Sequence, residues 1–274
     1  MTDWARGLWA ALVLVGLLAM AGSGLTAASA TSPRAAVARG PLVYAALGDS
    51  YASGYGVPPY SACGRSDAAY AVQLGHLRGV RLHRFVACAG ATTSTLRSGG
   101  QLDALDEHTE LVTVTIGGND TGWASAVASC LGGTDPECAR ALASSTERVT
   151  TTLPRALDRV CAQIATRAPH AHVLVVGYPR LFSPERGAFL LASTAEEQAL
   201  NRGADLLDEV IARAARAHGF TFVDVRDRFV DHGANAAYPW IFGPFTPAPF
   251  HPNAAGYRAY AAAVDEAVLR YLAS

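Results

Sequence analysis

The sequence of 274 residues contains no lysine. Its 22 basic residues are all arginine, and 23 acidic residues bring the net charge to -1. A nucleic-acid-binding domain presents a clustered excess of basic residues, so this balance excludes a nucleic acid as the expected partner. Charged residues make up only 16% of the chain, whereas hydrophobic residues make up 50%. Disordered chains have the opposite composition, and we therefore expect a folded protein with a large core.

Long hydrophobic runs are also scarce. The run from Leu8 to Met20 is too short to span a bilayer comfortably, because a transmembrane helix needs about 20 apolar residues. Arg6 precedes this run and an Ala-x-Ala sequence ends at Ala30, which is the pattern of a cleavable signal peptide. An uncleaved membrane anchor is the alternative. We expect a secreted protein without a stable membrane anchor, organised as a signal peptide at residues 1–30, a flexible lead-in at 31–40 and a single domain at 41–274.

Cysteines are few, and their spacing excludes the common zinc sites. No two of the five form a C-x-x-C pair, and no histidine lies at zinc-ligand spacing, so we expect no bound metal. None lies in a turn typical of a nucleophile, which argues against a cysteine hydrolase. In an oxidising compartment, five cysteines predict two disulfides and one free thiol. They are Cys63, Cys88, Cys130, Cys138 and Cys161.

Apolar, β-prone segments alternate with segments of helical periodicity along the chain. This alternation predicts βαβ units and a parallel sheet, and the apolar strands predict a sheet buried on both faces. The strands are expected at residues 42–47, 84–89, 111–116, 172–177 and 220–225. Helices are expected at 67–77, 146–168, 194–218 and 253–272, with a helical turn at 101–105 and a surface loop at 130–138. Pro154 either kinks the second helix or divides it in two.

Four residues of chemical interest follow these strands or open the last helix: Ser50, Gly90, Asn119 and His251. The carboxyl ends of parallel strands lie at one edge of a sheet, so residues just after them can meet. A serine becomes a useful nucleophile when a base such as histidine takes its proton. The Asn119 amide and the backbone N–H groups of Ser50 and Gly90 could then bind the oxyanion of acyl transfer.

Each of these residues also has a purely structural interpretation. Asp49 and Ser50 could cap a helix, and Asn119 and Asp120 could be turn residues. His251 could simply precede the last helix. Together, however, their order, their placement after strands and their residue types all fit one mechanism.

The stretch from Ala236 to Phe250 is rich in aromatic residues and proline. Its prolines and glycine exclude a helix. It is either a packed loop over the core or a wall of a pocket for apolar groups.

Four segments of the chain resemble the SGNH (GDSL-type) hydrolase superfamily, and within it the secreted lipases and esterases of actinobacteria. The segments are Gly48-Asp49-Ser50-Tyr51-Ala52-Ser53-Gly54, Cys88-Ala89-Gly90-Ala91, Gly117-Gly118-Asn119-Asp120 and His251-Pro252-Asn253-Ala254-Ala255-Gly256. The resemblance implies a three-layer α/β/α sandwich of the flavodoxin-like kind, with a central parallel sheet of about five strands. It also implies Ser50 as nucleophile, His251 as base, and an oxyanion hole formed by Ser50, Gly90 and Asn119, with no cofactor.

The chain departs from the family pattern at the residue that orients the histidine. Many members carry an aspartate three residues before it, where this chain has Ala248. The enzymes that this chain resembles can use a main-chain carbonyl instead, and we expect the Ala248 carbonyl to hold His251. The alternative is a carboxylate from Asp224, Asp227 or Asp231.

The second departure concerns disulfides, of which similar enzymes often have three. The resemblance implies the pairs Cys63–Cys88 and Cys130–Cys138. A third pair would need a cysteine near Asn235, where there is none, so Cys161 is expected to be unpaired and buried.

These observations predict a secreted, monomeric serine hydrolase that cleaves carboxylic esters of lipids or small molecules, through an acyl-enzyme on Ser50. Within the same chemistry, acetylated sugars and phospholipids are the alternative substrates. A catalytically silent surface or binding protein on the same fold is the alternative of another class.

Overall fold

The computed structural model describes residues 40–273, whose strands form one five-stranded sheet. All strand pairs are parallel, and the strand order is β2-β1-β3-β4-β5. The strands are β1 (Leu42–Gly48), β2 (Val80–Phe85), β3 (Leu111–Thr115), β4 (His172–Val176) and β5 (Thr221–Val223). The expected parallel sheet of five strands is confirmed.

Alternating residues of β1 pack into two separate cores, one on each face of the sheet. Tyr44 and Ala46 belong to one core, and Ala45 and Leu47 belong to the other. All four side chains are buried, which explains why β1 is apolar at every position instead of alternating with polar residues. The Tyr44 hydroxyl is hydrogen-bonded to Thr113 Oγ1 on β3 at 2.6 Å.

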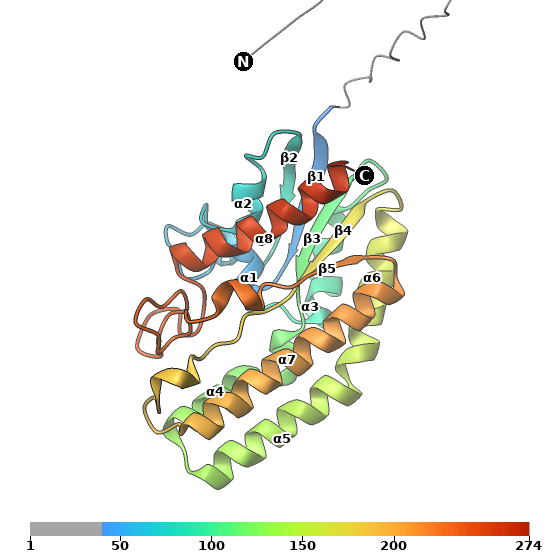
Figure 1. Ribbon diagram of the computed structural model, residues 1–274. Helices are drawn as coiled ribbons and strands as arrows, with labels where there is room; N and C mark the ends of the chain where they lie inside the picture. The colour runs from blue at the N-terminus through green and yellow to red at the C-terminus, as the bar shows by residue number, and fades with distance from the viewer. Residues whose placement is uncertain (1–39, 274) are drawn as a thin grey trace, which may run out of the picture. The chain divides into compact units, whose positions relative to one another are not determined.

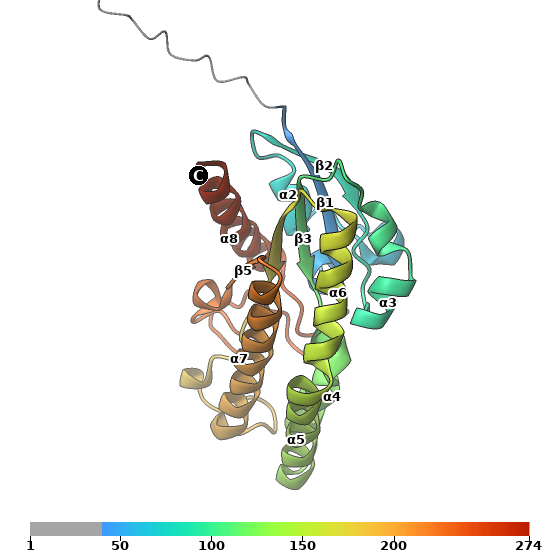
Figure 2. The ribbon, with the colours of Figure 1, turned by 90° about the vertical axis from the view of Figure 1, so that its right-hand side faces the viewer.

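Helices cover both faces of the sheet, as the three-layer expectation required (Figures 1 and 2). One face carries α2 (Tyr70–Leu74) and α8 (Ala254–Ala273), and the other carries α3 (Thr93–Ser98), α6 (Leu153–Arg167) and α7 (Thr194–Ala217). Two further helices, α4 (Trp123–Gly132) and α5 (Asp135–Thr151), pack against each other and against α7 beyond the carboxyl ends of the strands (Figure 1).

The strand order places a crevice at the carboxyl edge of the sheet. From β1 the chain first forms β2 on one side of β1. It then crosses back and forms β3, β4 and β5 in order on the other side. In sheets of this order, ligands bind where the direction reverses, between β1 and β3. The short helix α1 (Ser50–Ser53) follows β1, and the 3-10 helix η3 (Gly118–Thr121) follows β3. Both therefore begin at the crevice.

The second strand lies earlier in the chain than the sequence pattern predicts. β2 spans Val80–Phe85, whereas the prediction was 84–89. It is an edge strand whose side chains at Arg81, His83 and Arg84 are exposed, so it lacks the apolar run that marks the inner strands. The apolar residues after Phe85 instead form an extended segment that leads to Gly90.

The helices also differ from the prediction at two prolines. Residues 130–138 are not a surface loop: α4 continues to Gly132, and α5 begins at Asp135 with Pro136 in its first turn. Proline is favoured there because the first N–H groups of a helix have no partner within it. Pro154 stands in the first turn of α6, so it separates two helices instead of kinking one. Of the helix predicted at 67–77, only α2 (Tyr70–Leu74) is formed, with Gly75 as its C-cap.

The structure contains the two expected disulfides, Cys63–Cys88 and Cys130–Cys138. Cys161 on α6 is unpaired and buried, and burial raises the pKa of its thiol to about 12. A thiol that stays protonated is a poor nucleophile.

We expect peptide mapping of the mature, unreduced protein to recover the same two pairs and a free Cys161. The Cys130–Cys138 bridge closes a short loop, so its removal should cost about 2–3 kcal/mol in the loop-length description. A mapped bridge that involves Cys161 would show that the assignment is wrong.

The predicted signal peptide and all but the last residue of the predicted lead-in lie outside the described residues. Among the helices of residues 40–273, none combines the length and the apolar character needed to cross a membrane.

Candidate active site

Ser50 is the first residue of α1, directly after the turn that ends β1. Gly48 makes this turn possible: its φ is +132°, and a Cβ there would lie 2.4 Å from the Thr115 carbonyl oxygen. Asp49 then caps α1, because its carboxylate accepts the Tyr51 N–H at 2.9 Å. Asp49 therefore has the capping role of the structural alternative, whereas Ser50 lines the crevice.

The His251 ring joins Ser50 to a backbone carbonyl. Its Nε2 lies 2.8 Å from Ser50 Oγ, and its Nδ1 lies 2.9 Å from the Pro249 carbonyl oxygen. The prediction named the Ala248 carbonyl, but the hydrogen bond of the ring goes to Pro249 instead, and the Ala248 oxygen accepts the backbone N–H of His251 at 3.3 Å. Phe250 has a φ of +60°, and this left-handed turn brings the carbonyl two residues before His251 to the ring.

The surroundings of His251 keep its imidazole neutral. Burial lowers its pKa from the ordinary value, and the carbonyls of Pro249 and Ala248 oppose this shift only in part. The rings of Tyr51 and Tyr55 lie against it at centroid distances of 5.2 Å and 5.0 Å. A neutral imidazole whose Nδ1–H donates to a carbonyl leaves Nε2 as an acceptor for a hydroxyl proton.

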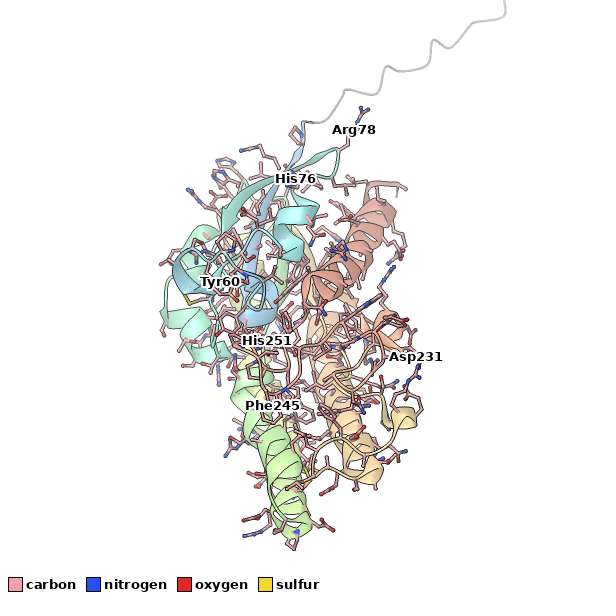
Figure 3. The ribbon with its side chains drawn as sticks, turned by 90° about the vertical axis from the view of Figure 1, so that its left-hand side faces the viewer. Tyr60, His76, Arg78, Asp231, Phe245 and His251 are labelled. Carbon is pink, nitrogen blue, oxygen red and sulfur yellow. A yellow bond between two sulfur atoms is a disulfide. The ribbon has the colours of Figure 1, made fainter. Side chains whose placement is uncertain are left out.

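The three aspartates considered as alternatives do not reach His251 in the described part of the chain. Asp224 is paired with Arg226, which accounts for the lowered pKa of that carboxyl despite partial burial. Asp227 and Asp231 are exposed. Figure 3 shows Asp231 well to the side of the labelled His251.

Asn119 lies on η3, across the crevice from Ser50. Its Nδ2 donates one hydrogen bond to the Ala91 carbonyl at 2.9 Å, which fixes the amide and leaves its second hydrogen free to bind a ligand. The next residue, Asp120, accepts the N–H of Thr93 at 3.0 Å and the Thr93 hydroxyl. These two contacts tie the loop after β3 to the loop that holds Gly90.

The backbone N–H groups of Ser50 and Gly90 complete the set of donors predicted from the sequence. Within residues 40–273, neither donates to another protein group. Gly90 has a φ of +81°, a conformation that glycine adopts without strain. The structure thus brings Ser50, His251 and Asn119 to one crevice, with Gly90 in the loop beside it.

Tyr178 connects the two sides of the site, and the sequence prediction missed this residue. Its hydroxyl donates to the Asp49 carboxylate and accepts the Gly118 N–H at 3.0 Å. It therefore links the residue before Ser50 to the residue before Asn119. The available signal was its position directly after the fourth strand, at the same edge as the other site residues.

Asp49 is fully buried, and its burial raises the pKa of its carboxyl to about 7. Hydrogen bonds from Tyr178 and Tyr51 counteract this effect in part. In the unfolded chain the same carboxyl titrates near 3.8. The folded state therefore binds one more proton than the unfolded state between about pH 4 and pH 7, and stability decreases as pH rises through this window.

We expect Asp49→Asn to remove this component of the pH dependence. The free energy of unfolding of the natural protein should fall relative to that of the variant by up to roughly 4 kcal/mol as pH rises from 4 to 7, at about 1.4 kcal/mol per pKa unit. Urea unfolding of both proteins across this range measures the difference, with exposed Asp67→Asn as control. Parallel curves for the natural protein and Asp49→Asn would contradict the assignment.

A cavity of about 590 Å³ opens beside Ser50 and His251, with a mostly apolar lining. One face of α4 forms a wall along its whole length, through Trp123, Val127 and Leu131 at helical spacing. Of the stretch predicted to be either a packed loop or a pocket wall, Pro244, Phe245, Pro249 and Phe250 line the cavity, and Phe245 is largely exposed (Figure 3). Among the described residues, no group of histidine, cysteine or acidic side chains is arranged to hold a metal ion.

Three known proteins of similar sequence or structure are lipases or phospholipases from Streptomyces. Lipase 1 of Streptomyces coelicolor is 38% identical over 251 residues, which covers 89% of this chain and 92% of that protein. The crystal structure of an extracellular lipase from Streptomyces rimosus superposes with a TM-score of 0.78 at 34% identity, covering 82% of this chain and 99% of the other. A phospholipase A1 from Streptomyces albidoflavus superposes with a TM-score of 0.76 at 33% identity and with the same coverage.

The family expected from the four sequence segments is confirmed over most of the chain. Residues 46–259 match the GDSL-like lipase/acylhydrolase family, and this range extends from within β1 into α8. The protein is therefore a carboxylic ester hydrolase that belongs to the GDSL-like lipase/acylhydrolase family.

Proposed function

We propose that the protein is a secreted serine esterase or lipase that transfers the acyl group of its substrate to Ser50. The observation that carries this proposal is the 2.8 Å contact between Ser50 Oγ and His251 Nε2 at the mouth of an apolar cavity. Secretion is supported by the signal-peptide pattern at residues 1–30 and by the extracellular lipase of S. rimosus among the relatives.

In the first step, Ser50 Oγ attacks the ester carbonyl carbon while His251 Nε2 takes the hydroxyl proton. The carbonyl oxygen becomes an oxyanion, which the N–H groups of Ser50, Gly90 and Asn119 stabilise. The tetrahedral intermediate collapses, the bond to the alcohol breaks, and His251 returns the proton to the leaving oxygen. Water then attacks the acyl-enzyme with the same base, releases the carboxylic acid and restores the Ser50 hydroxyl.

The Pro249 carbonyl takes the place of the carboxylate in a conventional triad. It accepts the Nδ1–H of His251 and so fixes the tautomer in which Nε2 is the base. A carbonyl carries no full charge, so it stabilises the protonated imidazole less than a carboxylate does. The resulting catalytic unit is a Ser50–His251 dyad.

The cavity favours an apolar acyl chain over a small acyl group. The wall formed by α4 has 10 residues, which corresponds to about 15 Å. An extended chain advances about 1.2 Å per bond, so this wall can accompany an acyl chain of roughly 12 carbons. An acetyl group would leave most of the cavity unfilled, which argues against acetylated sugars. One relative is a phospholipase A1, and a phospholipid differs from other candidate esters mainly in its leaving group.

The test combines covalent labelling with a series of esters. A fluorophosphonate should label Ser50 in the natural protein and leave Ser50→Ala unlabelled, as judged by peptide mass spectrometry. With p-nitrophenyl esters, kcat/KM should rise from acetate toward dodecanoate, because each buried methylene is worth about 0.8 kcal/mol, or at most about fourfold. Labelling elsewhere, or no hydrolysis of any ester, would contradict the proposal. A preference for acetate would be compatible with the acyl-enzyme mechanism but would contradict the proposed long-chain substrate.

A further inference from the structure

Gly203 occupies an unusual place in the fold. It lies in the interior of α7, a helix of 24 residues, with nine residues before it and fourteen after it. Glycine is the least favourable residue in a helix interior apart from proline, because it loses the most backbone freedom on folding. Its φ is not in the left-handed region, so backbone conformation does not explain the choice.

The indole ring of Trp123 explains it. A Cβ at position 203 would lie 2.5 Å and 2.6 Å from the ring carbons Cζ3 and Cη2 of Trp123. Carbon atoms that are not bonded to each other stay about 3.5–4.0 Å apart. The end of the ring therefore rests against the α7 backbone, at a place that only glycine leaves open.

Trp123 also lines the cavity beside the site. It is the first residue of α4, four positions after Asn119, and the chain neighbour of Gly203, Ala204, lines the same cavity from α7. The far end of the cavity is formed by Leu131 and Leu190, where the Leu191 N–H donates to the Leu131 carbonyl at 3.3 Å. An acyl chain that extends from Ser50 along α4 passes Trp123 before it reaches these residues.

We infer that the contact between Trp123 and Gly203 sets the width of the acyl groove, and through it the preference for acyl-chain length. The inference rests on the proposed function, since it assigns the cavity to the acyl chain. A side chain at position 203 closes the space that the indole end occupies. The ring then has to move away from α7, and the free space on its other side is the cavity that it lines.

The experiment measures the ratio of kcat/KM for p-nitrophenyl dodecanoate to that for p-nitrophenyl butyrate. In Gly203→Ala the ratio should fall about 15-fold, which corresponds to the loss of about two methylene positions at about fourfold each. In a Trp123→Ala background, the same substitution at position 203 should change the ratio less than about twofold. Arg202→Ala, at an exposed position on the same helix, is the matched control and should leave the ratio unchanged.

Trp123→Ala alone provides an independent reading if Gly203→Ala does not fold. Removal of the indole widens the groove near Ser50, so kcat/KM for a bulky branched ester, p-nitrophenyl 2-ethylhexanoate, should rise about tenfold relative to butyrate. Circular dichroism and thermal unfolding establish that each variant is folded.

The outcomes separate this inference from the proposed function. An unchanged ratio in folded Gly203→Ala overturns the inference, as does a fall that persists when Trp123 is absent. If Gly203→Ala does not fold, an unchanged branched-ester ratio in Trp123→Ala overturns it. In all these cases, fluorophosphonate labelling of Ser50 and hydrolysis by the natural protein still support the proposed function. If the natural protein is neither labelled nor active, both are overturned.

Discussion

Replacement of His251 by alanine should reduce kcat on a p-nitrophenyl ester by on the order of 10⁶-fold, the scale measured when a serine hydrolase loses its base. Asp224→Asn, Asp227→Asn and Asp231→Asn should each keep most of the activity. The reason is that the ring of His251 is held by the Pro249 carbonyl, whereas Asp224 is already paired with Arg226. Steady-state kinetics of the four single variants measures the difference.

Two further results decide whether a dyad is the correct description. The double variant Ser50→Ala/His251→Ala should be no less active than either single variant. When two residues act as one catalytic unit, the loss of one already removes the contribution of the other. A loss near 10⁴-fold in any of the three aspartate variants would identify a conventional triad, since this is the effect of removing the triad carboxylate. Such a loss would rule out the role of the Pro249 carbonyl.

The positions of Ser50 and Asn119 follow from the sequence because each depends on the topology of the fold, whereas His251 lies in the loop before α8 and was identified from its sequence segment. Parallel strands end at one edge, so a residue that directly follows a strand is placed by the sheet itself. The carbonyl that holds His251 depends instead on a single backbone torsion. Phe250 takes a φ of +60°, which few residues other than glycine adopt, and the sequence pattern gives no sign of it.

Contacts that form only between distant segments were also missing from the prediction. Tyr178 is 129 residues away from Asp49, and only the folded sheet brings its hydroxyl to that carboxylate. The position of β2 was predicted incorrectly because β2 lies at the edge of the sheet, which the sequence does not reveal. An edge strand exposes one side to solvent, so its polar residues hide the apolar pattern that identified the inner strands.

The residue types of the loop after β3 predicted its chemistry, but not the contacts that hold the loop in place. The Asn119 amide is fixed by the Ala91 carbonyl, and the neighbouring Asp120 is bonded to Thr93. Both contacts reach the loop of Gly90, so the two loops hold their donors in a fixed relation before any substrate binds. Preorganised donors of this kind stabilise an oxyanion without further rearrangement.

Asn119→Ala should therefore lower kcat by about 10²–10³-fold, the effect of losing one oxyanion donor, with little change in KM. The amide contributes mainly when negative charge develops on the oxygen, so its loss affects the transition state more than substrate binding. The same substitution also removes the bond to the Ala91 carbonyl, and a looser loop could lower the rate without any oxyanion contact.

Asp120→Ala distinguishes these two causes of a rate loss in Asn119→Ala. It removes the neighbouring tie to Thr93 but no donor to the oxyanion. If Asn119 acts on the oxyanion, Asp120→Ala should lose no more than about tenfold in kcat, well short of the loss expected for a missing donor. Equal losses in both variants would mean that Asn119 only supports the loop, and unchanged turnover in Asn119→Ala would remove it from the site.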